Sequence, residues 1–155
     1  LPAWQGWIPV PQNYVSVSWD TSTLVDFLSF LSLDVDIYEV SVYAKRGLRT
    51  HGLRHLLPDM SGIHDICFIQ IGGNDIGLLS NEKILTNILS FSEYLIHGLE
   101  FKIVIIGKLL RRDPHVSLAG YNEAILDINS HLAEKIKTDE RVYFWRHRGF
   151  WQNLS

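Results

Sequence analysis

Apolar and polar positions follow two different periods along the chain, and the period separates predicted strands from predicted helices. Short runs rich in β-branched and aromatic residues predict strands at 13–19, 35–44, 65–71, 101–107 and 141–146. Apolar residues three and four positions apart predict helices at about 24–31, 81–97 and 118–137, the last with Ser117 as its N-cap. Strands and helices therefore alternate.

Two of these runs, 65–71 and 101–107, are apolar at nearly every position rather than at every second one. Strands of this kind are buried on both faces, as in a parallel sheet that helices cover on each side. We therefore expect a three-layer, doubly wound α/β fold with a mainly parallel five-stranded sheet, in which these two strands are central. In such sheets the functional residues gather at the carboxyl ends of the strands.

The length of 155 residues is that of one domain. Three of the five prolines fall in residues 1–12, so we expect an extended N-terminal arm there and a single domain over 13–155. The chain begins without methionine and ends at Trp-Gln-Asn-Leu-Ser. We expect it to be an excerpt of a longer protein.

Charge and composition argue against several classes of partner. A net charge of −3 gives no electrostatic case for binding nucleic acid or an anionic membrane surface. No apolar run approaches the roughly 18 residues that a transmembrane helix needs, and the first residues lack the pattern of a signal peptide. The single cysteine, Cys67, lies in an apolar run and is expected to be a buried hydrophobic residue. An intracellular location is the expectation.

The segment Ile-Gly-Gly-Asn-Asp, which ends the third predicted strand, is the first candidate for chemistry. Gly72 and Gly73 allow the backbone to leave the strand sharply. Asn74 then carries a neutral N–H donor at the edge of the sheet, which suits a developing oxyanion in acyl transfer. Asp75 can accept hydrogen bonds from nearby backbone and fix the turn. The alternative is a simple strand-to-loop turn in which Asn74 caps its own backbone.

The order of elements, together with this motif, resembles the SGNH hydrolases, or GDSL-type esterases and lipases. Members of that family have a glycine after the second strand and Gly-x-Asn-Asp after the third. Here Ala-Lys-Arg-Gly-Leu-Arg-Thr places Gly47 after the second strand, and Gly-Gly-Asn-Asp places Asn74 and Asp75 after the third. The resemblance covers roughly 13–151 and implies that Gly47 and Asn74 supply oxyanion-hole donors, so we expect them to lie close together. The chain looks like the SGNH-type domains found in many animal proteins, several of them derived from mobile elements.

The chain departs from the family pattern at the nucleophile and at the base. No Gly-Asp-Ser or Gly-x-Ser occurs. By its position in the sequence Ser18 is the first candidate for the nucleophile, and Ser16 and Ser22 are the next candidates. No Asp-x-x-His occurs either, and we expect that segment just beyond residue 155. His147, between two arginines, is a candidate base, although an exposed basic turn is the alternative.

Two further patterns carry less chemistry. His51 and His55 have a spacing that can hold a metal on an α-helix, but Gly52 weakens that helix and no glutamate lies between the histidines. We expect neither a metal nor a cofactor. The segments 111–115 and 145–151 mix basic and aromatic residues as nucleic-acid surfaces do, and we interpret them as solvated loops.

Two functions remain at this point. The first is an ester or acyl hydrolase acting on a small ester or acylated substrate, weak or inactive as this excerpt. The second is a catalytically degenerate SGNH-like module for binding or scaffolding, possibly derived from a mobile element.

Overall fold

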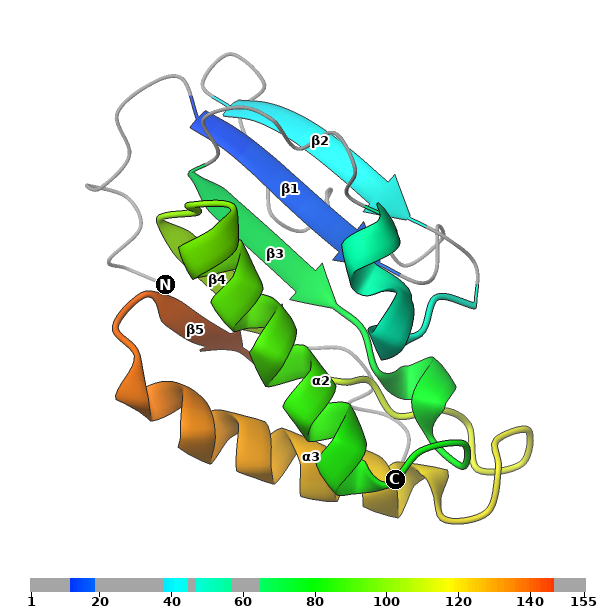
Figure 1. Ribbon diagram of the computed structural model, residues 1–155. Helices are drawn as coiled ribbons and strands as arrows, with labels where there is room; N and C mark the ends of the chain where they lie inside the picture. The colour runs from blue at the N-terminus through cyan, green and yellow to red at the C-terminus, as the bar shows by residue number, and fades with distance from the viewer. Residues whose placement is uncertain (1–11, 19–37, 45–46, 57–64, 147–155) are drawn as a thin grey trace.

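The computed structural model describes residues 12–18, 38–44, 47–56 and 65–146 (Figure 1). In this part of the chain one sheet has the strand order β2-β1-β3-β4-β5, and every neighbouring pair is parallel. The strands are β1 (Gln12–Ser18), β2 (Tyr38–Ala44), β3 (Ile66–Gln70), β4 (Ile103–Gly107) and β5 (Val142–Trp145). The order reverses between β1 and β3, which makes the carboxyl ends of these two strands the expected location of a binding site.

The two strands with unbroken apolar sequence, β3 and β4, are internal strands of the sheet, as predicted. Cys67 and Ile69 are buried on one face of β3, and Ile66 and Phe68 are buried on the other. An α/β fold around a parallel sheet is therefore confirmed for the described residues. The predicted arm at 1–12 and the predicted helix at 24–31 lie outside them.

Helices and helical turns connect the strands in the predicted order. After η2 (Thr50–Leu56), a 3-10 helix, and η3 (Gly73–Asp75), a 3-10 turn, comes α2 (Asn81–Glu93), which continues as the π-helix η4 (Tyr94–Gly98). The last long helix is α3 (Tyr121–Lys135), followed by the 3-10 turn η5 (Ile136–Thr138). None of the helices in the described ranges is long and apolar enough to span a bilayer.

The start of α3 differs from the prediction. Ser117 is not the N-cap, because the helix begins only at Tyr121 and its N-cap residue is Gly120, with φ of 78°. The backbone N–H of Ser117 instead donates to the carbonyl of Asp113 at 3.0 Å, in a turn that precedes the helix. The side chain of Leu118 lies against Gly77, so the predicted first residue of the helix packs on another loop.

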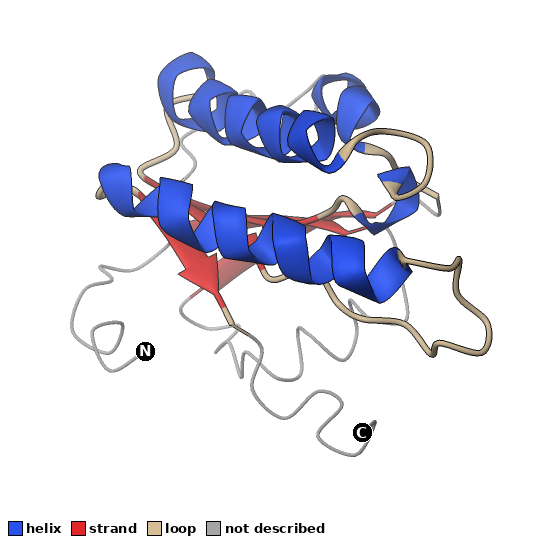
Figure 2. Ribbon diagram, turned by 90° about the horizontal axis from the view of Figure 1, so that it is seen from below, coloured by secondary structure: helices blue, strands red, loops and turns tan. Residues whose placement is uncertain are grey.

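One hydrophobic core joins α2, α3 and one face of the sheet. Figure 1 shows α2 crossing in front of the sheet and α3 running beside it, and Figure 2 shows the same arrangement from below. The residues of this core with no more than 1% exposure include Cys67, Ile69, Ile84, Ile88, Leu95, Val104, Ile106, Ile125, Ile128 and Leu132. Burial raises the pKa of the Cys67 thiol far above its ordinary value, as its position in an apolar strand predicts.

The carboxyl end of β4 is shaped by its neighbour. A β-carbon at Gly107 would overlap the Gln70 side-chain oxygen and would lie 2.7 Å from the ring of Phe68. The side-chain nitrogen of Gln70 also donates to the carbonyl of Lys108 at 2.9 Å. Gly107 therefore provides the space in which the Gln70 side chain crosses from β3 to the end of β4.

Candidate active site

The backbone leaves β3 through two glycines. Gly72 has φ of 122°, a conformation that other residues rarely adopt, and a β-carbon there would lie 2.9 Å from Leu109. A β-carbon at Gly73 would lie 2.6 Å from the hydroxyl oxygen of Tyr121. Both positions therefore require glycine, the first for conformation and packing and the second for packing alone. The turn that they permit places Asn74 and Asp75 at the carboxyl edge of the sheet.

Asp75 joins this turn to the loop after β2. Its carboxylate is fully buried and accepts from the backbone N–H of Thr50 at 2.8 Å and from Arg49 Nε at 2.9 Å. Its backbone carbonyl accepts from Leu78 and Leu79, both at 2.9 Å. Asp75 therefore fixes its own turn, and it also holds the start of η2, about 25 residues earlier in the sequence.

The side-chain amide of Asn74 is held at both ends. Its nitrogen donates to the carbonyl of Leu48 at 3.0 Å, and its oxygen accepts from Arg112 at 3.1 Å. Since Leu48 follows Gly47 directly, Asn74 and Gly47 lie in neighbouring loops at one edge of the sheet, as expected. Gly47 has φ of 70° and is exposed. An amide nitrogen has two hydrogens, so the bond to Leu48 leaves the second available for another acceptor.

The ring of Tyr121 lies beneath the guanidinium of Arg112, and Tyr121 is buried. The guanidinium carbon of Arg112 lies 4.6 Å from the centre of the Tyr121 ring, within the range of a cation–π contact. Burial raises the pKa of the Tyr121 hydroxyl, and the positive charge of Arg112 opposes that rise. The phenol therefore stays protonated at neutral pH.

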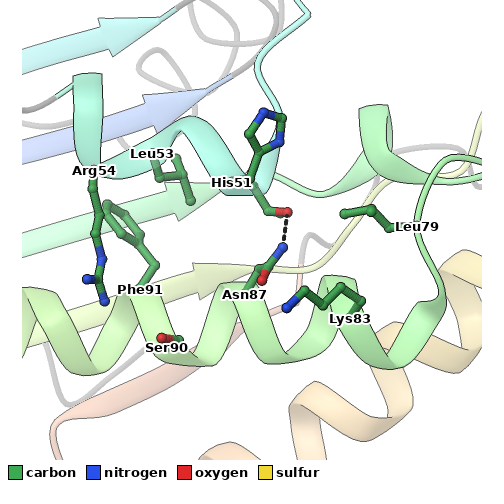
Figure 3. Close-up of a pocket in the computed structure, with 9 residues that line it drawn as sticks. His51, Leu53, Arg54, Leu79, Lys83, Asn87, Ser90 and Phe91 are labelled. Carbon is green, nitrogen blue, oxygen red and sulfur yellow. Dashed lines mark hydrogen bonds between the residues drawn. The ribbon is translucent and has the colours of Figure 1, made fainter.

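A pocket of about 350 Å³ lies between η2 and α2 (Figure 3). Asn87 reaches across it from α2 and donates to the hydroxyl of Thr50 at 2.9 Å. The described residues that line it include the basic side chains of Arg54 and Lys83, and none of them is acidic. Thr50 connects the pocket to the turn of Asn74 and Asp75. Its backbone N–H donates to the Asp75 carboxylate, and its side chain faces the pocket. No pattern in the sequence predicts this pocket.

Comparison with solved structures shows similar folds at low sequence identity. A Streptococcus pneumonia protein described as a platelet activating factor superposes with a TM-score of 0.69 and 18% identity, covering 92% of this chain and 68% of that one. A GDSL-like lipase from Bacteroides thetaiotaomicron gives a TM-score of 0.63 and 17% identity, covering 87% and 67%. AlinE4, an SGNH-hydrolase family esterase, gives 0.59 and 15%, covering 88% and 76%.

The fold is that of the SGNH hydrolases. A comparison with protein-family models found no match, and neither did a comparison with curated proteins. The resemblance that the Gly-Gly-Asn-Asp motif indicated is therefore supported by the three-dimensional structure of the chain.

The register of β1 gives two of the three candidate serines a definite position. Ser18 is the last residue of β1, beside Ala44 of β2 and Gln70 of β3 at the carboxyl edge. Ser16 is two residues deeper in the same strand, paired with Val42 and Phe68. Ser22 lies outside the described residues. Of the two serines that the structure describes, Ser18 is the one placed by its backbone at the edge that also carries Gly47 and Asn74.

No base in the described ranges completes the SGNH constellation. His147 lies outside the described residues. His51 and His115 are exposed, and neither imidazole makes a hydrogen bond to another described residue. His51 and His55 belong to a 3-10 helix, whose three residues per turn place positions four apart on different faces. Within the described residues no three His, Cys, Asp or Glu side chains are grouped as metal ligands would be.

Sequence reasoning missed two residues at this site, Arg49 and Arg112. Both are brought to the motif from loops distant in sequence, and each contacts one of its two polar residues. Arg112 belongs to a segment that we interpreted as a solvated loop. No local pattern distinguishes it from Arg111, which is also exposed.

Proposed function

We propose that the chain is an SGNH-type ester or acyl hydrolase domain, weak as this 155-residue chain, that acts on a small ester or acylated substrate. The observation that supports it most is the position of the Asn74 amide at the carboxyl edge of the sheet. This amide is bonded to Leu48 in the loop after β2 that contains Gly47 and Leu48, called the Gly47 loop below. Neutral N–H donors fixed at one point stabilise the oxyanion of a tetrahedral intermediate. In this proposal Gly47 and Asn74 are the donors, Asp75 supports their turn, and Ser18 is the nucleophile.

A catalytically degenerate SGNH-like module for binding or scaffolding, possibly derived from a mobile element, is the second candidate. One observation favours it: the Asn74 amide already donates one of its hydrogens to Leu48. The 155 residues also contain no Gly-x-Ser, which is the nucleophile motif of an active SGNH hydrolase. A serine needs a base within hydrogen-bond reach to act as a nucleophile.

A short-chain nitrophenyl ester separates the two candidates, because its leaving group departs without protonation. We expect a small rate above the buffer blank, and we expect Asn74→Ala to lower that excess by about 100-fold, the usual cost of losing one oxyanion-hole donor. Asn81→Ala is the matched control, because the Asn81 amide donates to Asp127 of α3 and not to Leu48. Equal rates for the blank, the unchanged chain and Asn74→Ala would overturn the hydrolase proposal and favour the binding module.

The nucleophile is tested separately. Incubation with a fluorophosphonate, followed by mass spectrometry of proteolytic peptides, identifies any serine that is activated. Labelling of Ser18 that disappears in Ser18→Ala would support its assignment. Labelling of a different serine would reject Ser18 and leave the oxyanion-hole assignment in place.

A further inference from the structure

The contacts of Asn74 determine which way its amide points. The carbonyl oxygen faces a guanidinium, which only donates, and the nitrogen faces the backbone carbonyl of Leu48, which only accepts. An amide turned by 180° would oppose donor to donor at Arg112 and acceptor to acceptor at Leu48. Arg112 and Leu48 together therefore select one orientation of the Asn74 amide.

Arg112 is held in place although its side chain is exposed. Its backbone N–H donates to the side-chain oxygen of Asn122 at 3.0 Å, and its carbonyl accepts from the side-chain nitrogen of Asn122 at 2.9 Å. The guanidinium rests over the ring of Tyr121. Tyr121 and Asn122 form the first turn of α3, so the helix positions Arg112 through both its backbone and its side chain.

We propose that Arg112 is a positioning residue for the oxyanion hole: it fixes the Asn74 amide with its N–H side toward the Gly47 loop and strengthens that amide as a donor. This inference rests on the proposed function for its catalytic consequence, but the orientation itself can be measured independently. A cation bound to the carbonyl oxygen draws electron density from the amide and makes the remaining N–H a better donor. Arg112 acts only through Asn74 and does not touch the reacting atoms.

The side-chain amide signals of Asn74 in a ¹⁵N-labelled chain report this role directly, and Asn74→Ala identifies them by their disappearance. In Arg112→Gln we expect the Asn74 signals to shift. We also expect exchange of its amide protons with water to accelerate about two- to tenfold, as the loss of one hydrogen bond implies. Arg112→Lys keeps the charge without the planar fork and should give an intermediate result. Arg111→Gln, which removes the same charge one residue away, should leave the signals unchanged.

Nitrophenyl ester hydrolysis by the same variants then tests the catalytic consequence. We expect Arg112→Gln to lower kcat about two- to tenfold with KM nearly unchanged, because the contact acts on a donor that is used in the transition state. Asn74 signals that are the same in Arg112→Gln and in the unchanged chain would overturn the inference. Shifted signals with no hydrolysis by any variant would support the positioning role and reject the hydrolase proposal, so the two failures are distinguishable.

Discussion

The side chain of Asn129 makes two hydrogen bonds to the backbone of Leu109, accepting from its N–H at 2.8 Å and donating to its carbonyl at 2.9 Å. Asn122 makes the same pair of bonds to Arg112 at the surface. The two asparagines are two turns apart on α3. The helix therefore holds the loop after β4 at two points, one buried and one exposed.

Replacement of Asn129 by alanine should be much more costly than replacement of Asn122. Asn129→Ala leaves a buried N–H and a buried carbonyl of Leu109 without partners, which we expect to lower the free energy of unfolding by about 2–4 kcal/mol. In Asn122→Ala water can replace both bonds, and the expected loss is below about 1 kcal/mol. Urea denaturation of the two variants measures the difference. Equal losses would show that the buried pair has no special weight.

The glycines of the motif should not tolerate a methyl group. Gly73→Ala places a β-carbon against the Tyr121 hydroxyl and should destabilise the chain by about 1–3 kcal/mol. Gly52→Ala is the control, because a β-carbon there meets nothing within 4 Å. A thermal melt of each variant compares them. A Gly73→Ala chain as stable as Gly52→Ala would mean that Tyr121 moves aside freely.

The stability of the chain should depend on the charge and the two acceptor oxygens of the Asp75 carboxylate, and not only on the size of the side chain. In Asp75→Asn one of the two oxygen acceptors becomes a donor, and it then faces either the N–H of Thr50 or the guanidinium of Arg49. We expect a loss of about 1–3 kcal/mol in the free energy of unfolding. Asp139→Asn is a comparison at an exposed ion pair, where we expect less than about 1 kcal/mol. The prediction fails if both substitutions have the same effect.

Because the pKa of Cys67 is raised in the folded chain, the free energy of unfolding should depend on pH in the alkaline range. Burial raises this pKa in the folded chain, so the unfolded thiol, with an ordinary pKa of about 8.5, ionises first. Above that pH the unfolded state has lost a proton that the folded state retains. The free energy of unfolding should then fall by up to about 1.4 kcal/mol per pH unit relative to Cys67→Val. Denaturation of both chains between pH 7 and pH 10 tests this, and parallel curves would contradict it.

Much of the fold could be predicted from periodicity. The runs at 65–71 and 101–107 indicated internal strands because almost every side chain in them is apolar, and residues 81–97 indicated a helix because its apolar residues share one stripe. The start of α3 was predicted three residues too early, because Leu118 continues the apolar spacing of the helix but packs on Gly77. A contact of this kind, between loops far apart in the sequence, cannot be predicted from the local sequence pattern.

For a similar reason, only some of the polar residues of the candidate site could be predicted from the sequence. Asn74 and Asp75 follow a strand end, where a parallel sheet concentrates function. Their partners Arg49 and Arg112 lie in other loops, and only the register of the strands brings them near. The pocket between η2 and α2 also depends on how two helices lie on the sheet, which the apolar stripe of either helix alone does not determine.

The crossing of Gln70 over Gly107 has a consequence for how this chain can change over generations. Any residue larger than glycine at position 107 collides with the side chain at position 70, so a substitution there is harmful while glutamine is present. A shorter residue at position 70 loses the bond to Lys108 and removes one of the two side chains that a β-carbon at 107 would meet. The ring of Phe68 is the other, so changes at 68 and 70 must precede a change at 107. A library that randomises these positions singly would find 107 closed, whereas one that varies all three together would find it open.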